Sequence, residues 1–222
     1  MPAKRLRKAF LVIGLGYFGR SVARSLVRLG HEVLGVDKDM AVLDELKDEL
    51  TEVVQMDATQ PQALAQLSIP DFDACIVGRG TDLAESITIT MLLKDLGATY
   101  VIAKAMTDLQ ARILERIGAD RIVFPERDSG ERLAHSLVSP RILDFLELAP
   151  NYSLQEITAP PLMAGKTLGE LNLRREYGIN VVVIKSGDHI NPTPHGEDVI
   201  HAGDVLVIVG RDSDMERFLS LA

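Results

Sequence analysis

The sequence has one cysteine, no long apolar run and no excess of basic residues. Because Cys75 is the only cysteine among 222 residues, no disulfide can form within the chain, which fits a reducing compartment. We expect its thiol to be a small buried side chain. The longest apolar stretches, AFLVIGLG and NVVVI, are far shorter than the about 20 residues that a membrane-spanning helix requires. The formal net charge of −8 argues against a general nucleic-acid binder. We therefore expect a soluble, cytoplasmic protein.

Signatures of catalysis are missing as well. The chain has no Ser/His/Asp constellation, no Cys/His pair and no HExxH motif. His189, His195 and His201 lie in polar turns without the spacing of zinc ligands. About 70 residues follow the expected sheet, which is little room for a substrate domain. These absences favour a ligand-sensing module, with an NAD-dependent oxidoreductase as the alternative.

Three passages share one pattern of helix, glycine and strand. In RLGHEVLGVD, DLGATYVIAK and RIGADRIVFP, a helical pattern ends at Gly30, Gly97 or Gly118, and a β-branched run follows. This alternation predicts a Rossmann-like α/β domain over residues 1–138, a doubly wound parallel sheet. Strands are expected near 8–13, 32–36, 53–56, 73–77, 100–104 and 121–124, and helices near 17–29, 39–49, 60–67, 82–96, 107–117 and 126–138.

The pattern changes after residue 138. SPRILDFLELAPN predicts a linker helix and loop over 139–150. Strand-like runs follow, and the turns KSGD and HAGD suit antiparallel connections. We expect residues 151–222 to form a separate, small α+β lobe, with strands at 152–158, 179–185, 188–191 and 204–209.

The first expected strand runs into Gly14-Leu15-Gly16-Tyr17-Phe18-Gly19, a G-x-G-x-x-G motif that a helix follows. The first glycine permits a tight turn, the second lets a phosphate approach the backbone, and the third lets helix and strand pack closely. The free N–H groups at the start of the helix favour an anion. The motif therefore predicts a nucleotide site.

Asp37 ends the second strand, where a carboxylate can bind the two ribose hydroxyls. A carboxylate there disfavours a 2′-phosphate, so NADP is disfavoured. It does not separate NAD from ATP, ADP or AMP, which share the adenosine half. Asp57 and Thr59 end the third strand, where they either meet the adenine or cap a helix.

The remaining strand ends supply more polar groups. GRGTD follows the fourth strand, and Lys104 after the fifth is placed to bind phosphate. Glu126 and Asp128 follow the sixth. These two acids are either ligands of a divalent cation or acids that favour the N-terminal dipole of a helix.

The combination of VIGLGYFGRSVARSL, VDKD, DAT, ERIGADRIVFPERDSGERLA and LNLRREYGINVVVIKSGD closely resembles the RCK (KTN) regulatory subunits of Ktr/Trk-type potassium-uptake systems. The resemblance covers nearly the whole chain, as an RCK-N lobe followed by a TrkA-C (RCK-C) lobe. It implies a cytoplasmic protein that is not an enzyme. It also implies a homodimer within an octameric ring, docked on a membrane potassium-translocating subunit of the KtrB/TrkH type.

The resemblance implies ATP and ADP as ligands in Ktr types and NAD or NADH in Trk types. It gives Glu126 the role of an acid that binds Ca²⁺ or Mg²⁺ near the terminal phosphate. Tyr17 departs from the family, in which an arginine often stands at that position; Arg20, Arg79 and a neighbouring subunit are the candidates to replace its charge. The cofactor-binding residues that we expect are Gly14, Gly16, Tyr17, Phe18, Gly19, Asp37, Lys38, Asp57, Ala58, Thr59, Arg79, Gly80, Lys104 and Glu126.

A second ligand is implied for the small lobe. Arg174, Tyr177, Asn180 and Val181 resemble residues that line a cyclic di-AMP site in several Ktr proteins, although related lobes share this run without binding that ligand. The resemblance also implies a mechanism. A triphosphate with a divalent cation and a diphosphate would favour different hinge angles between paired lobes, and the ring would act on the membrane subunit.

Overall fold

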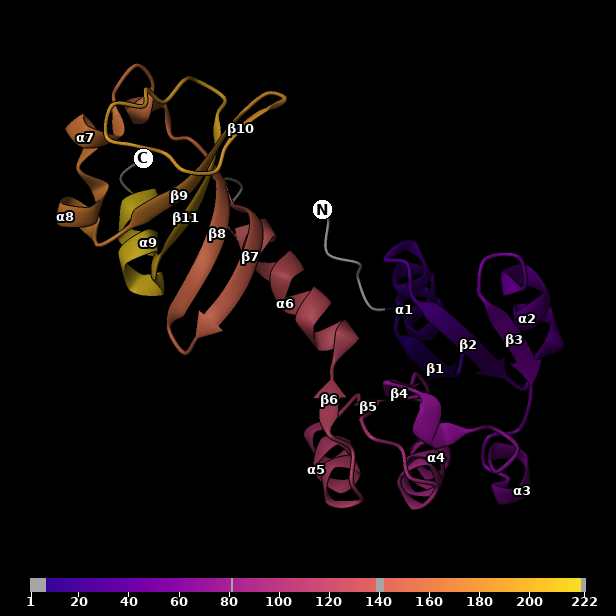
Figure 1. Cartoon of the computed structure of the whole chain (residues 1–222). Coiled ribbons are helices and arrows are strands. Elements are labelled where there is room, and N and C mark those ends of the chain that lie inside the picture. The colour runs from indigo at the N-terminus through magenta and orange to yellow at the C-terminus, as the bar shows by residue number, and fades with distance from the viewer. Residues whose placement is uncertain (1–6, 81, 139–141, 221–222) are drawn as a thin grey trace. The chain divides into compact units, whose positions relative to one another are not determined.

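The computed structural model describes residues 7–80, 82–138 and 142–220 (Figure 1). The chain divides into two compact units, Met1–Arg127 and Asp128–Ala222. Helix α6 (Pro125–Val138) begins in the first unit and continues into the second. No helix in these described ranges is both long and apolar enough to cross a bilayer.

The first unit is built on a six-stranded parallel sheet of order β3-β2-β1-β4-β5-β6. This is the order of a doubly wound dinucleotide-binding fold, so the fold class predicted from sequence is confirmed. The strands are β1 (Ala9–Ile13), β2 (Glu32–Asp37), β3 (Glu52–Gln55), β4 (Ala74–Val77), β5 (Val101–Lys104) and β6 (Arg121–Val123). The helices are α1 (Tyr17–Arg28), α2 (Met40–Leu46), α3 (Pro61–Leu64), α4 (Leu83–Asp95) and α5 (Asp108–Arg116), with a short 3₁₀ turn at Ile69–Asp71.

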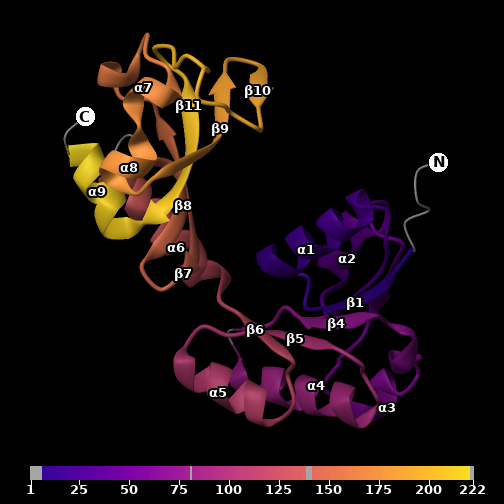
Figure 2. The same ribbon diagram turned by 60° about the vertical axis from the view of Figure 1, so that its left-hand side comes forward.

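Helices cover both faces of this sheet (Figure 2), with α1 and α2 on one face and α3, α4 and α5 on the other. Strand β1 contributes to two apolar cores because its side chains alternate. Leu11 and Ile13 join the core beneath α4 and α5, whereas Val12 joins the core beneath α1 and α2. Gly30, Gly97 and Gly118 all have positive φ at the ends of α1, α4 and α5, as the repeated sequence pattern predicts.

The second unit contains a five-stranded antiparallel sheet of order β10-β9-β11-β8-β7. Its strands are β7 (Ile142–Ala149), β8 (Tyr152–Thr158), β9 (Asn180–Ser186), β10 (His189–Asn191) and β11 (Val205–Arg211). A 3₁₀ turn (Pro161–Met163) and the helices α7 (Leu168–Leu171), α8 (Leu173–Tyr177) and α9 (Asp212–Ser220) complete it. The side chains of Leu173 on α8 and of Met215 and Phe218 on α9 are buried in the core of this unit.

The linker helix expected over 139–150 is wrong for residues 142–149, which form β7 in a hairpin with β8; residues 139–141 lie outside the described residues. The pairing shifts register between Ile142 and Asp144 and again between Glu147 and Ala149. An extra residue at such a shift places side chains three apart on one face of a strand. Ile142 and Phe145 are spaced in this way, and their spacing imitates a helix. Asn151, with a φ of 66°, lies in the turn that closes the hairpin.

Candidate functional site

The glycine loop joins β1 to α1, and two of its glycines are required by close packing. Gly14 has a φ of 86°, and its N–H donates to the carbonyl of Val36 at 2.8 Å. A Cβ on Gly19 would lie 1.9 Å from the carbonyl oxygen of Gly14. These two positions therefore accept only glycine, and they hold the start of α1 against the end of β1.

Gly16 differs from these two glycines because it faces open space. A Cβ built on Gly16 meets nothing within 4 Å. Gly16 is the N-cap residue of α1; no side chain caps this helix, and no acid lies in its first turn. The first N–H groups of a helix have no partner inside the helix and carry a partial positive charge. The loop therefore fits an anionic group such as a phosphate, in the space that a Cβ on Gly16 would fill.

Asp37 lies at the end of β2 beside this loop, as the sequence predicts. Its side chain is only 7% exposed. One carboxylate oxygen accepts from the N–H of Leu15 at 2.7 Å. The other oxygen accepts from the N–H of Asp39 at 3.1 Å and from the guanidinium of Arg79 at 3.3 Å. These three protein donors hold the Asp37 carboxylate beside the glycine loop.

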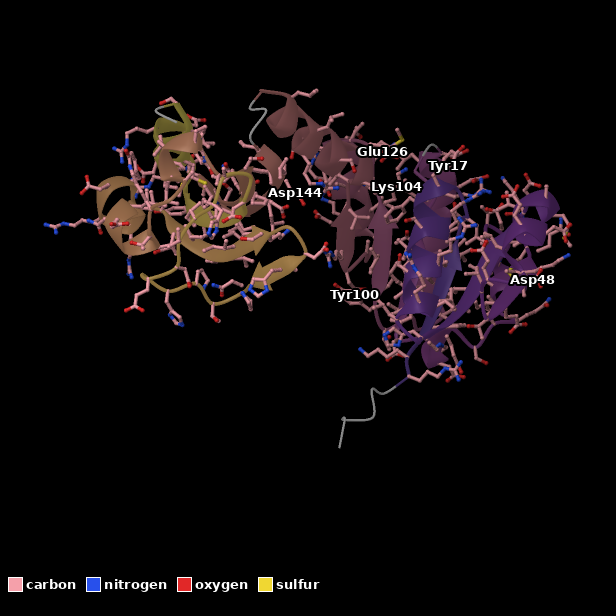
Figure 3. The ribbon with its side chains drawn as sticks, turned by 90° about the horizontal axis from the view of Figure 1, so that it is seen from above. Tyr17, Asp48, Tyr100, Lys104, Glu126 and Asp144 are labelled. Carbon is pink, nitrogen blue, oxygen red and sulfur yellow. The ribbon has the colours of Figure 1, made fainter. Side chains whose placement is uncertain are left out.

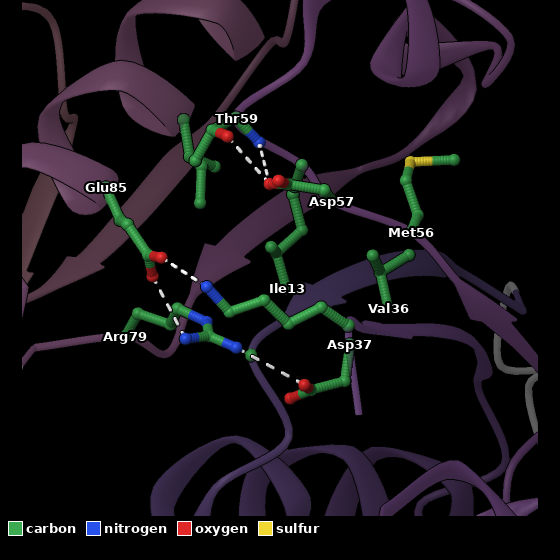
Figure 4. A pocket seen from close by; sticks show the side chains of 12 residues that line it. Ile13, Val36, Asp37, Met56, Asp57, Thr59, Arg79 and Glu85 are labelled. Atoms are coloured by element: carbon green, nitrogen blue, oxygen red, sulfur yellow. Dashed lines mark hydrogen bonds and ion pairs between the residues drawn. The ribbon is translucent and has the colours of Figure 1, made fainter. Parts of the chain in front are cut away.

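Asp37 belongs to a small cavity that Figure 4 shows from close by. The cavity volume is about 10 Å³, enough for about one water molecule. Of the predicted ligand residues, Gly14, Asp37, Lys38, Asp57, Ala58, Thr59 and Arg79 line it. It is also lined by Ile13, Val36, Met56, Glu85 and Ile89.

Glu85 is the charged lining residue that the sequence analysis missed. Its carboxylate accepts from Arg79 at 3.0 Å and forms an ion pair with the ammonium of Lys38. Asp82 caps α4 by accepting from the N–H of Glu85 at 3.1 Å. Glu85 stands three residues after Asp82, the spacing of a capping box, so sequence alone pointed to a local role. Its side chain instead turns to the cavity and bonds Arg79 and Lys38.

Asp57 and Thr59 form a tight local turn on the opposite wall of this cavity (Figure 4). One oxygen of Asp57 accepts from both the hydroxyl of Thr59, at 2.7 Å, and its N–H, at 3.0 Å. These hydrogen bonds from Thr59 lower the pKa of Asp57 below its ordinary value, so the carboxylate is ionised at neutral pH. The helix-capping alternative is wrong, because the N-cap of α3 is Gln60 and no side chain caps this helix. Contact with an adenine stays a prediction, and both residues line the cavity.

Lys104 and Glu126 form a second cluster at the same edge of the sheet. The ammonium of Lys104 lies 2.5 Å from a carboxylate oxygen of Glu126, and this bond lowers the pKa of Glu126. Gly80 makes room for the stem of Lys104, because a Cβ on Gly80 would lie 3.2 Å from it. In Figure 3, Lys104, Glu126 and Tyr17 lie at one end of the strands, and Tyr100, which precedes β5, lies at the other.

The side chains of Tyr17 and Phe18 point to different surroundings. Tyr17 is 92% exposed, with the guanidinium of Arg20 5.6 Å from its ring centre. Arg20 itself donates to the carbonyl of Leu15 and pairs with Glu45, each within 3.1 Å. Phe18 packs in the core beneath α1 and α2 rather than along the cavity. Arg79, in contrast to Arg20, does reach the cavity.

Of the four residues predicted to bind a second ligand, three lie in one groove and one does not. Arg174, Asn180 and Val181 line an open groove between α7, α8 and the start of β9. Tyr177 does not line it; its ring packs edge-on against Phe218 at 5.2 Å between centres. The structure thus brings three of these four residues together and leaves Tyr177 partly buried against the core of this unit.

The described residues include no group of three or more His, Cys, Asp or Glu side chains that could hold a metal ion. Glu126 is therefore a single carboxylate whose present partner is Lys104. A cation at this point would need further oxygen ligands from another molecule, such as phosphate oxygens.

Comparison with known proteins finds two family models along the chain. The TrkA-N domain matches residues 10–125, and the TrkA-C domain matches residues 154–222. The chain is similar to Ktr system potassium uptake protein C of Bacillus subtilis (strain 168), at 41% identity over 213 residues, 96% of each chain. It is 38% identical to Ktr system potassium uptake protein A of the same organism over 211 residues, 95% of each chain.

Solved structures share the fold at lower identity. A crystal structure of the GsuK RCK domain superimposes with a TM-score of 0.65 at 21% identity, covering 98% of this chain and 48% of that chain. A GsuK channel bound to NAD superimposes with a TM-score of 0.64 at 20% identity, covering 95% of this chain and 38% of that chain.

Proposed function

This chain belongs to the family of Ktr/Trk-type potassium-uptake regulators that join a TrkA-N domain to a TrkA-C domain, and from that premise we propose that it is a nucleotide-sensing subunit that gates a membrane potassium transporter or channel. Its relatives are regulatory subunits and not enzymes, which excludes the NAD-dependent oxidoreductase considered from the sequence. The observation that carries the proposal is the likeness to two Ktr proteins over almost the whole chain, combined with a glycine loop open at Gly16.

We propose an adenine nucleotide as the ligand, ATP or ADP, with its phosphates at Gly16 and the N-terminus of α1. Asp37 stands where a ribose would lie, and its negative charge disfavours a 2′-phosphate. The adenine would lie between Asp57, Ala58 and Thr59, which line the cavity beyond Asp37. NAD or NADH is the alternative, because it shares the adenosine half, and the GsuK channel of similar fold is bound to NAD.

A divalent cation, Mg²⁺ or Ca²⁺, is the second part of this proposal. Glu126 is ionised and more than half exposed, so its carboxylate is available to a cation that phosphate oxygens also hold. A cation bound to Glu126 would repel the ammonium of Lys104, which would then be free to approach a phosphate. The cation would supply the positive charge that Tyr17 does not.

We propose that the chain acts in the cytoplasm, at the inner face of the membrane, as a homodimer within an octameric ring docked on a potassium-translocating subunit. Its role follows from unequal affinity. A ligand shifts a conformational equilibrium only if it binds one state more tightly than the other. ATP with its cation and ADP would favour different arrangements of paired lobes, and the partner would respond to that difference.

The groove at Arg174, Asn180 and Val181 supports cyclic di-AMP as a second ligand of the small lobe. An arginine beside an apolar side chain offers a phosphate partner and a surface for a base. We propose that this site adds a second signal to the same regulator.

Titration calorimetry of the full chain with ATP, ADP and NADH, each with and without Mg²⁺ or Ca²⁺, tests the ligand. We expect ATP and ADP to bind, and the cation to strengthen ATP binding more than ADP binding. Tight NADH binding without any response to ATP or ADP would overturn the adenine-nucleotide assignment. The variant Asp37→Asn removes the ribose-binding charge and keeps the side-chain volume, so it should bind ATP, ADP and NADH more weakly.

A further inference from the structure

The guanidinium of Arg79 lies across the nucleotide cavity, between two carboxylates. Its Nη2 donates to Asp37 at 3.3 Å, and its Nη1 donates to Glu85 at 3.0 Å (Figure 4). Glu85 also pairs with Lys38. The result is a chain of four charged groups that crosses the site from the end of β2 to the first turn of α4. Each of these side chains lines the cavity.

The first atoms of Arg79 are fixed by their surroundings. A Cβ on Gly14 would lie 2.6 Å from the Cγ of Arg79, so the glycine at this position makes room for the arginine stem. The backbone carbonyl of Arg79 accepts from the hydroxyl of Ser86 at 2.6 Å. The stem is thus anchored between the glycine loop and α4, and the guanidinium is the part that can move.

A nucleoside cannot enter this cavity as it stands. The free volume is about 10 Å³, whereas pockets for small ligands usually measure about 300–1,000 Å³. One oxygen of Asp37 is engaged by Leu15, and the other is shared by Asp39 and Arg79. A carboxylate has about four acceptor positions, and these three donors leave one of them open. Two ribose hydroxyls need two positions, so one present donor has to leave, and the guanidinium of Arg79 is the donor among the three that belongs to a side chain.

We propose that Arg79 is an internal latch on the nucleotide site, held by Asp37 and Glu85 when no nucleotide is bound and transferred to a ligand phosphate when one enters. This inference rests on the proposed nucleotide binding. An arginine that leaves two carboxylates loses two charge-assisted hydrogen bonds, and a ligand phosphate offers it two new ones in their place. A nucleoside without phosphate displaces the guanidinium and offers it no such bond. The latch therefore makes the site select phosphorylated ligands, and it lowers the affinity of every ligand by the fraction of open sites.

Binding of adenosine and of ADP to the full chain separates this role from simpler ones. Adenosine is the half that ATP, ADP and NAD share, so the test does not depend on which of them is the natural ligand. We expect Arg79→Gln to bind adenosine at least about threefold more tightly than the wild type, because no latch has to open. We expect it to bind ADP about tenfold more weakly, because a charge-assisted bond to phosphate is lost.

Glu85→Gln is the second variant, and it loosens the latch while keeping the arginine. We expect it to bind both adenosine and ADP more tightly than the wild type does. Arg24→Gln is the matched control: Arg24 lies one turn further along α1 than Arg20 and pairs with Glu49 outside the cavity, so its loss should not change adenosine affinity. Thermal unfolding of each variant confirms that it is folded.

Adenosine affinity that is unchanged, reduced or undetectable in both Arg79→Gln and Glu85→Gln overturns the latch. If only ADP weakens in Arg79→Gln, the arginine is a phosphate ligand and nothing more. A wild-type chain that binds none of ATP, ADP and NADH overturns the proposed nucleotide binding, and the latch with it.

Discussion

Lys104 and Glu126 join the end of β5 to the first turn of α6 through an ion pair of 2.5 Å. Lys104 is 11% exposed at its side chain and Glu126 is 60% exposed, so the carboxylate faces solvent while its partner is largely covered. Each of the two groups that we assign to phosphate and cation therefore has the other as its partner in the structure. A phosphate that binds Lys104, or a cation that binds Glu126, therefore has to compete with this ion pair.

Removal of Lys104 should raise the pKa of Glu126. The hydrogen bond from Lys104 is the main cause of the lowered pKa, so Lys104→Met should return it toward the ordinary value of about 4.3. The sign also fixes the pH window: a lowered carboxyl pKa stabilises the folded state above the ordinary value, and this contribution is lost as the pH falls through the lowered one. NMR titration of the Glu126 carboxyl carbon measures the shift directly.

Lys94→Met is the control for that titration. Lys94 pairs with Asp120 at the start of β5, whereas Lys104 ends that strand, so loss of Lys94 should leave the pKa of Glu126 unchanged. A Glu126 pKa that stays low in Lys104→Met would mean that another group holds the carboxylate.

Two alanine substitutions in the glycine loop should have opposite effects. Gly19→Ala forces a Cβ to 1.9 Å from a carbonyl oxygen, and we expect it to destabilise the fold by about 3 kcal/mol or more. Gly16→Ala meets no protein atom and keeps an allowed φ of −63°, so its stability should stay within about 1 kcal/mol of the wild type. It should lose nucleotide affinity, since the new methyl group stands where a phosphate would approach.

Denaturant unfolding and ADP titration measure both effects on the same samples. Gly16→Ala that is stable and still binds ADP with wild-type affinity would remove the helix N-terminus from the proposed site.

Within the second unit, neighbouring arginines should differ in their effect on cyclic di-AMP. Arg174 lines the groove, whereas Arg175 does not, so Arg174→Ala should weaken binding about tenfold and Arg175→Ala should have little effect. Tyr177→Phe should bind normally because the ring packs against Phe218. Calorimetry with cyclic di-AMP decides this, and equal losses in both alanine variants would show a general effect of charge.

Cys75 should be inert in the folded protein. It lies buried in β4, and burial raises the pKa of its thiol to about 12, so almost no thiolate exists at neutral pH. We expect Ellman's reagent to react with it only after unfolding. Cys75→Ala supplies the background rate, and rapid reaction of the folded chain would contradict the buried position of β4.

The parts of the site that sequence predicted are those set by local spacing. The glycine loop and Asp37 follow directly from a strand, a turn and a second strand, and parallel strands bring their carboxyl ends to one edge. The partnership of Arg79 with Glu85 and Asp37 depends instead on where side chains from β2 and α4 meet. The capping-box spacing of Asp82 and Glu85 indicates a helix cap and gives no sign that the carboxylate of Glu85 reaches the cavity. The cap uses only the backbone N–H of Glu85.

The fold, too, was predicted where local spacing determines it and missed where strand pairing does. The alternation of helix and strand patterns predicted all six strands of the first sheet, including β3 and β6, which are only partly apolar. It failed for β7, where register shifts gave a strand the spacing of a helix. The family resemblance, drawn from motifs in both units, is confirmed by matches to both domain models.

The central claim is that a bound nucleotide controls potassium movement through a partner. The most direct measurement is potassium flux in proteoliposomes that hold the potassium-translocating subunit of the same organism, with this chain added and ATP, ADP, NADH or no nucleotide present. The account predicts that flux differs between ATP and ADP with the wild-type chain, and that the difference disappears with Gly16→Ala. Flux that is the same under all four conditions, from a chain shown to be docked on its partner, would contradict it.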